Sequence, residues 1–532
     1  MVLRTFATSV ALLVGLAVVG SVAGPQWDPR PVSDHLVPAT ADTTVQVSAD
    51  GRAVPDVGAV GDHAVRTTRV TIALDGATVD GVLRRPLDSD GDVLADRPGV
   101  VFVHGAGTGS SAEAFVDTAD LLASAGVVTL VPDKRLDTYS TRERDYEHMA
   151  LDYQRSVDLL RTVEGVDPGR VGVYGESEGT WIAPVMQVDD PAIAFTVLVS
   201  APIVPPREQA AYAVDSYLRN TQVPDQLFRA IPRAVGMQFP GGGFGYADFD
   251  VRPWLERQSA PVLVVYGTAD PSMPVEQGAR IVLSDTAVSP EPAPVTVRYY
   301  GGANHGIRLA PADHPGNDPE HPSPLHPDFP RDLAAWVQGL PATGTAEPTV
   351  AGATPDQLYL AAPVPRPGWW GNGDVVVVAV VGGAALVLGG LTLLGAVSGW
   401  RALGRRRDRP APAPAAPGIA APLGVLGLAS VATTVVLAVY LMLVARLALD
   451  YEKNALVVQG GWVTVRVLGL VAVVAGSVLL LRAARVRAER RAGRDSAVAR
   501  GGVAHVGVWA VGLGSASLLV TLAYWGVFQL GI

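Results

Sequence analysis

The sequence predicts an α/β fold: a doubly wound, mostly parallel sheet, interrupted by a lid insertion and followed by an all-α region of four transmembrane helices. Two patterns indicate this division. Between residues 66 and 340, short β-branched runs alternate with stretches of helical length, which is typical of a parallel sheet covered by helices on both faces. After residue 375, the apolar residues form runs of at least about 20, the length needed to cross a bilayer.

The composition excludes some classes of function. The chain of 532 residues contains no cysteine, so it has neither disulfides nor thiolate metal sites. Its formal net charge of -10 argues against a nucleic-acid partner, which would require clustered Lys and Arg on a folded face. No motif calls for a cofactor.

The N-terminus predicts export. Residues 1–24 carry Arg4, then a short apolar run, then small residues at Ser21 and Ala23. This pattern favours a cleaved signal peptide, with a retained N-terminal anchor as the alternative. Residues 25–65 are rich in Pro, Asp and Gly and read as a loosely ordered leader.

The first half of the predicted sheet domain begins with a hairpin. Alternating apolar residues flank Asp75 and Gly76, a pair typical of a tight turn. The elements expected next are a buried strand (99–104) that leads into 105–107, a helix (112–125), a strand (127–131), a helix (146–163) and a strand that begins at 171.

In the second half, the alternation of strands and helices is interrupted. A strand at 193–200 precedes residues 203–258, where aromatic residues and arginines appear without the previous pattern. An insertion at this point would lie over the sheet edge as a lid. Strands at 261–266 and 295–300 follow, and a helix at 330–340 closes the domain.

The sequence Gly-Glu-Ser-Glu-Gly at 175–179 lies where a strand must turn sharply into a helix. This is the G-x-S-x-G pattern of a nucleophile elbow. Small residues on both sides of the turn let strand and helix approach closely, so the hydroxyl of Ser177 would be exposed above a helix N-terminus. Because such a pentapeptide arises often by chance in a glycine-rich chain, its partners must be found elsewhere.

With the sheet, the elbow and their order established, residues 66–340 resemble the α/β-hydrolase family, especially its dienelactone-hydrolase-like and peptidase-like members. The resemblance implies a Ser, Asp, His triad in that chain order. Asp270 follows the strand at 261–266, and His305 follows the strand at 295–300 within Gly-Gly-Ala-Asn-His-Gly. The alternative acid position of this fold, after Ser200, has no carboxylate, which leaves Asp270.

The expected roles follow from the needs of acyl transfer. His305 would take the proton of Ser177 and return it to the leaving group, while Asp270 would orient the imidazole. The oxyanion requires fixed N–H donors, and these are expected at the backbones of Ala106 and Glu178.

Several neighbouring residues allow two interpretations. His104 ends a buried strand and is either the base or, more simply, a residue that shapes the oxyanion turn. Glu176 and Glu178 are either acids favoured at a helix start or side chains that select a polar substrate. Asp133 and Lys134 either line the pocket or belong to a charged surface loop.

A tract with three histidines allows a metal site or a solvated loop. His314, His321 and His326 lie among Asp, Glu and many prolines without a regular period, which favours the loop. No metal is therefore expected.

The last third of the chain predicts a membrane region. After a linker at 341–374, residues 375–532 contain four apolar runs, at about 375–400, 418–447, 457–481 and 502–530. Arginines concentrate in the loops 401–409 and 482–500, so the positive-inside rule places these loops in the cytoplasm and the sheet domain and C-terminus outside. Arg446 and Arg466 near span ends are intramembrane functional residues or, at lower cost, snorkelling side chains.

The sequence therefore predicts an integral membrane serine hydrolase that cleaves a small or lipid-like carboxylic ester outside the cytoplasm. A serine peptidase or an acyltransferase would use the same residues. A non-catalytic sensor or scaffold is the alternative from another class, and an incomplete triad would have favoured it. The oligomeric state is not predicted.

Overall fold

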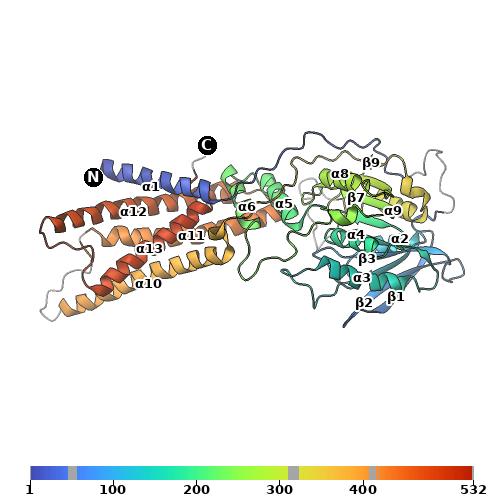
Figure 1. Ribbon diagram of the computed structural model, residues 1–532, viewed down its shortest axis with the longest axis horizontal. Coiled ribbons are helices and arrows are strands. Elements are labelled where there is room, and N and C mark those ends of the chain that lie inside the picture. Colours follow the sequence, from blue (N-terminus) through green and yellow to red (C-terminus); the bar gives the residue numbers. More distant parts are fainter. Residues whose placement is uncertain (1, 46–56, 310–322, 406–414, 417, 530–532) are drawn as a thin grey trace. The chain divides into compact units, whose positions relative to one another are not determined.

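The computed structural model describes residues 2–45, 57–309, 323–405, 415–416 and 418–529 (Figure 1). The chain divides into two compact units. The sheet unit comprises Asp28–Ser216 and Phe244–Pro363, and the helical unit comprises Met1–Trp27, Tyr217–Gly243 and Val364–Ile532.

The sheet unit is built on one nine-stranded sheet in the order β1-β2-β4-β3-β5-β6-β7-β8-β9. β1 pairs with β2 and β2 with β4 in antiparallel fashion, and every later pair is parallel. The strands are β1 (Ala64–Ala73), β2 (Thr78–Leu87), β3 (Arg97–Val103), β4 (Val128–Pro132), β5 (Val166–Glu176), β6 (Thr196–Val199), β7 (Val262–Gly267), β8 (Val295–Tyr300) and β9 (Val350–Gly352).

Helices cover both faces of this sheet (Figure 1). The core on one face contains residues of α3 (Tyr146–Leu160), α4 (Gly179–Asp189) and α8 (Val275–Thr286). The core on the other face contains residues of α2 (Val116–Ser124) and α9 (Asp328–Gln338). The predicted fold class, a doubly wound and mostly parallel sheet followed by helices, is confirmed.

Successive side chains of the central strand β3 pack alternately in the two cores. Val101 and Val103 belong to one core, while Val100 and Phe102 belong to the other. Side chains alternate across a strand, so an uninterrupted apolar run is what a strand buried on both faces requires.

The predicted D-G hairpin is present between β1 and β2, with Gly76 at φ 73° and the Leu74 N–H bonded to the Ala77 carbonyl. α8 and β9 are among the elements that lie where none is predicted. β9 falls inside the linker predicted at 341–374. It has only three residues, too few for an alternating pattern, and it forms by pairing with β8.

The described part of the predicted leader packs on the sheet unit. The Arg298 side chain donates from Nε to the Thr43 carbonyl at 3.0 Å, and the Leu36 N–H donates to Glu276 Oε2 at 2.7 Å. The buried carboxylate of Glu276 also accepts from the Gln357 N–H. Segments that precede and follow the sheet domain in the sequence are thus bound to it by the buried side chains of Arg298 and Glu276. The composition of these segments does not reveal this pattern.

Among the described residues, the helical unit contains five helices that are long and apolar enough to cross a membrane. They are α1 (Val2–Ala23), α10 (Gly373–Arg405), α11 (Ala420–Leu449), α12 (Gly461–Arg491) and α13 (Gly502–Tyr524). Near the helix ends, Arg446 lies 3.5 Å from Asp450, and Arg466 donates to the Gln529 carbonyl at 2.9 Å.

The N-terminal helix α1 packs into this unit, against α12 and α13. A Cβ at Gly20 would overlap the Ala523 carbonyl oxygen, so this glycine permits close packing. The buried Arg233 of α6 (Ala230–Val235) donates to the Gly20 carbonyl at 2.9 Å. Trp370 donates to the Ala23 carbonyl at 2.7 Å.

The insertion predicted at 203–258 is divided between the two units. α5 (Pro206–Asn220) begins in the sheet unit, whereas the following residues up to Gly243 belong to the helical unit. Among them, Leu227 packs in the apolar cluster that contains Val465 and Leu522 of the helical unit. The apolar residues of the insertion thus pack in the helical unit as well as in the sheet unit.

Candidate active site

Ser177 lies in a strained turn between β5 and α4. Its φ of 54° is uncommon for a residue other than glycine. A Cβ at Gly179 would overlap the Val103 carbonyl oxygen, so only glycine lets α4 start this close to β3. The Ser177 N–H donates to the Val199 carbonyl at 2.9 Å, which fixes the turn to the neighbouring strand. This is the geometry expected of a nucleophile elbow.

Asp270 and His305 form a direct pair. Asp270 Oδ2 lies 2.7 Å from His305 Nδ1, with the carboxylate fully buried and 27% of the histidine side chain exposed. The other carboxylate oxygen accepts two hydrogen bonds from Ser272, through its N–H at 2.9 Å and its hydroxyl at 2.7 Å. The carboxylate is therefore held in place, and Nε2 is the histidine nitrogen left for chemistry.

The pair shifts both pKa values. Burial alone would raise the pKa of Asp270, but the charge and hydrogen bond of His305 and the bonds from Ser272 outweigh it and lower that pKa. Burial alone would lower the pKa of His305, but the Asp270 carboxylate and the nearby Glu176 raise it to about 8. A proton on His305 is thus stabilised by its neighbours.

Ser177, Asp270 and His305 follow β5, β7 and β8, so they lie at the same edge of the parallel sheet. The Ser200 hydroxyl, at the end of β6 between them, donates to the His305 carbonyl at 2.6 Å. This bond fastens the histidine loop to the end of β6. Among the described hydrogen bonds none joins Ser177 to His305, a contact that apo enzymes commonly leave long.

The turn after β3 lies beside Ser177. A Cβ built on Gly105 would be 3.3 Å from Ser177 Cβ and 4.0 Å from its Oγ. Within the described part of the chain, the N–H groups of Ala106 and Glu178 have no acceptor. Both predicted oxyanion donors are therefore free within the described residues, one in the turn after β3 and one directly after the serine.

The Glu178 side chain lies at the centre of a buried charge network. Its Oε2 is 3.0 Å from Lys134 Nζ, and both side chains are only 1% exposed. Arg144 binds Oε1 at 2.6 Å, and the Tyr139 hydroxyl donates to Oε2 at 3.0 Å. Glu178 is thus neither a simple helix-start acid nor a substrate-binding group. Lys134 is a buried partner of Glu178 and not a charge on a solvated loop.

This network also binds residues 105–107, the turn after β3 that contains the predicted oxyanion donor Ala106. Lys134 Nζ donates to the Gly105 carbonyl at 2.5 Å, and the Tyr139 hydroxyl oxygen lies 3.3 Å from the Ala106 carbonyl oxygen. In a trans peptide the C=O and the next N–H point in opposite directions. Holding the Gly105 carbonyl therefore fixes the direction of the Ala106 N–H. Sequence reasoning missed this role because it depends on contacts between distant segments.

His104 is a structural residue of the same turn. Its Nε2 donates to the Pro132 carbonyl at 2.6 Å, and its Nδ1 lies 3.2 Å from the Thr108 hydroxyl. Burial lowers the pKa of His104 to about 4, so the ring is neutral at pH 7 and Nδ1 accepts from Thr108. With both nitrogens occupied, His104 shapes the turn and is not the base.

Glu176, on the other side of Ser177, lies near the histidine. Burial raises its pKa, opposed by the charge of His305 and by the Tyr174 hydroxyl, which lies 3.4 Å from Glu176 Oε2. Its charge in turn raises the pKa of His305. Glu176 therefore acts on the base side of the site, unlike Glu178.

No group of three or more metal-binding side chains is found in the described residues. Two of the histidines of the tract, His314 and His321, lie outside the described residues. His326 is described, and its ring contacts Tyr300 in the sheet unit at a centroid distance of 5.1 Å.

No family model matches the sequence, and no curated protein is similar to it. Solved structures that are similar include an esterase from Pyrobaculum calidifontis, at 17% identity and a TM-score of 0.37. The alignment covers 53% of this chain and 88% of the esterase chain. A second is an esterase from Pyrococcus furiosus, at 18% identity and a TM-score of 0.30, covering 44% of this chain and 82% of its own.

A third similar structure comes from Klebsiella pneumoniae and is named "Putative Dienelactone Hydrolase". It has 16% identity and a TM-score of 0.34, and it covers 53% of this chain and 98% of its own. These structures are esterases and a dienelactone hydrolase-like protein of the α/β-hydrolase fold. In this chain, the site consists of the Ser177 turn after β5 and of the loops after β7 and β8, which Asp270 and His305 join.

Proposed function

We propose that the chain is a membrane-anchored serine hydrolase that cleaves carboxylic esters through Ser177, His305 and Asp270. The observation that carries the proposal is the buried Asp270 carboxylate, 2.7 Å from His305, at the sheet edge where Ser177 occupies a left-handed turn. Two N–H groups without an acceptor among the described residues lie beside Ser177, that of Ala106 in the turn after β3 and that of Glu178 directly after the serine.

The proposed reaction has two steps. Ser177 Oγ attacks the ester carbonyl while His305 Nε2 takes its proton, and the oxyanion accepts hydrogen bonds from Ala106 and Glu178. His305 then gives the proton to the leaving alcohol, which leaves an acyl group on Ser177. In the second step, water loses a proton to His305 and attacks the acyl group, which releases the acid and restores Ser177.

The test is a substrate panel with the full chain in neutral detergent. We expect hydrolysis of p-nitrophenyl esters of short or long acids, and a loss of at least about 10⁴-fold in Ser177→Ala. Faster cleavage of matched p-nitroanilides would favour a peptidase. Ester hydrolysis that is unchanged in Ser177→Ala would reject the proposal.

We also propose that the sheet unit lies outside the cytoplasm. The arginines at 482–500, with the positive-inside rule, support this orientation. A protease added to intact cells should remove the sheet unit. Digestion only after lysis would contradict this orientation.

For α1, we favour retention as a fifth span over cleavage. Its packing at Gly20, the Arg233 bond to the Gly20 carbonyl and the Trp370 bond to Ala23 support this choice. The intact mass of the purified protein should include residues 1–23, and a mass that lacks them would favour the signal peptide.

A further inference from the structure

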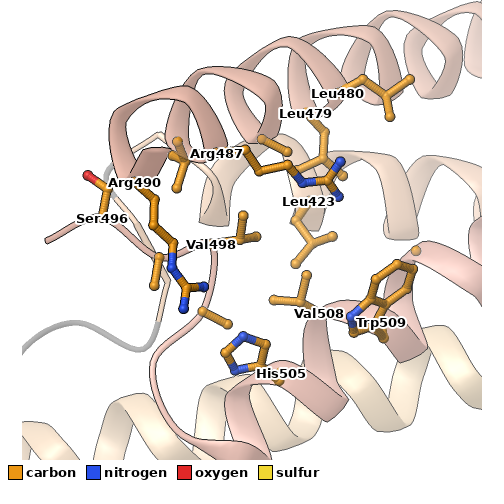
Figure 2. Close-up of a pocket in the computed structure, with 15 residues that line it drawn as sticks. Leu423, Leu479, Leu480, Arg487, Arg490, Ser496, Val498, His505, Val508 and Trp509 are labelled. Atoms are coloured by element: carbon orange, nitrogen blue, oxygen red, sulfur yellow. The ribbon is translucent and has the colours of Figure 1, made fainter. Parts of the chain in front are cut away.

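The helical unit contains a cavity of about 350 Å³ at the end where α12 stops and α13 begins (Figure 2). Its walls come from α11, α12, α13 and the segment 496–499. The volume is within the range of about 300–1,000 Å³ typical of ligand pockets. All of its lining residues belong to the helical unit, far in sequence from Ser177.

The lining changes from cationic to apolar along the helices. Arg490 of α12 and His505 of α13 line one end, and the Arg487 side chain extends from α12 towards Leu423 and Leu479 (Figure 2). Leu480 lies seven residues before Arg487, and Gly512 lies seven residues after His505, so each is about 10 Å deeper along its helix. Arg490 and His505 thus lie at one end of the cavity, and Leu480 and Gly512 lie at the other.

Within the described part of the chain, the arginines that line the cavity, Arg487 and Arg490, are not paired with acids. The nearest acid on the same helix, Glu489, lies 3.2 Å from Arg485 and accepts from the Ser496 hydroxyl at 3.1 Å. His505 Nδ1 donates to the Gly501 carbonyl at 3.2 Å.

We propose that this cavity binds one anionic phospholipid, with its headgroup beside Arg490 and Arg487 and an acyl chain along the apolar wall. Arginine matches phosphate oxygens with paired N–H donors, and basic pockets between membrane helices suit anionic headgroups. Trp509, which also lines the cavity, is of the type that sits at headgroup depth. The lipid contributes charge complementarity at one end and apolar contact at the other.

The test is native mass spectrometry of the full chain in neutral detergent with phosphatidylglycerol or phosphatidylcholine of identical acyl chains. One phosphatidylglycerol should be retained in preference to phosphatidylcholine. Arg487→Gln with Arg490→Gln should weaken its binding about 30-fold, the factor expected from two arginines beside an anionic headgroup. The matched control, Arg485→Gln with Arg494→Gln, removes the same charge outside the cavity and should bind as the wild type does.

A second variant tests the apolar end. A Cβ at Gly512 meets no heavy atom within 4 Å, so Gly512→Phe can be accommodated by filling the cavity. It should abolish retention of phosphatidylglycerol while the protein remains monodisperse. Equal retention of both lipids, or unchanged binding in the double arginine variant, would overturn the proposal. Displacement by millimolar inorganic phosphate, or unchanged binding in Gly512→Phe, would indicate a free-anion site and overturn the lipid assignment.

Discussion

The two sides of Ser177 are built in different ways. On the base side, Asp270 holds a histidine whose side chain is 27% exposed and whose nitrogen faces the reacting atoms in the proposed mechanism. On the oxyanion side, Lys134 and Glu178 are each 1% exposed, and they hold backbone groups. In the proposed mechanism, the charged pair on the base side transfers a proton, whereas the charged pair on the oxyanion side fixes the orientation of a peptide group.

This difference explains why the two glutamates beside the serine are not equivalent. Glu178 compensates the buried charges of Lys134 and Arg144, whereas Glu176 acts electrostatically on His305. Changes on the base side should therefore alter proton transfer and its pH dependence. Changes on the oxyanion side should alter the rate without moving the pKa of the base.

The largest effect is expected for Asp270→Asn. The amide cannot stabilise the imidazolium and favours the wrong tautomer of His305, so kcat should fall by roughly 10⁴-fold. Steady-state kinetics on a p-nitrophenyl ester measures the loss, and the thermal unfolding midpoint serves as the control for folding. A loss below tenfold with the fold intact would remove Asp270 from the mechanism.

Glu178→Gln should lower both stability and rate. It leaves the buried cations Lys134 and Arg144 without a carboxylate, which costs on the order of 3 kcal/mol of folding free energy. Because the Gly105 peptide loses its support, kcat should also fall by roughly 100-fold. Denaturation followed by tryptophan fluorescence, together with kinetics below the new midpoint, separates the two effects. Wild-type values for both would contradict the network.

Lys134→Met tests the peptide orientation more narrowly. Loss of the Lys134 bond to the Gly105 carbonyl should reduce kcat by roughly 10- to 100-fold, with little change in KM. The pH at which kcat/KM reaches half its maximum should stay at its wild-type value. A shift of that pH with an unchanged maximum would move Lys134 to the base side. Arg135→Met, an adjacent cation that pairs with Asp137, is the matched control.

The smallest effect is expected for Glu176→Gln. His305 must be neutral to accept the proton, so kcat/KM of the wild type should rise with pH through a pKa of about 8. Glu176 raises that pKa, so its removal should shift the rise to lower pH and change the maximal rate by less than tenfold. A pH profile of kcat/KM measures the shift. A rise at higher pH than in the wild type would contradict the placement of Glu176.

Much of the sheet and of the site could be predicted from the sequence because both depend on local patterns. Uninterrupted apolar runs such as β3 and β7 mark strands buried on both faces, and the loops after them contain Ala106 and Asp270. The chain order of the site residues then follows from the parallel topology.

The features that could not be predicted depend on contacts between distant segments. The three residues of β9 are a strand only because β8 lies beside them. In the sequence, Lys134 has the pattern of a charged loop residue, because its partner Glu178 lies 44 residues later and only the fold brings the two together. The packing of α1 likewise depends on Arg233 and Ala523, which no local pattern connects with an apolar N-terminal run.

The central claim is that Ser177 is the nucleophile, and its most direct test is covalent labelling of the full chain with a serine-reactive phosphonate. We expect one adduct on the wild type, assigned to Ser177 by peptide mass spectrometry, and none on folded Ser177→Ala. Labelling should be slower in Asp270→Asn. Equal labelling of the wild type and Ser177→Ala would contradict the account.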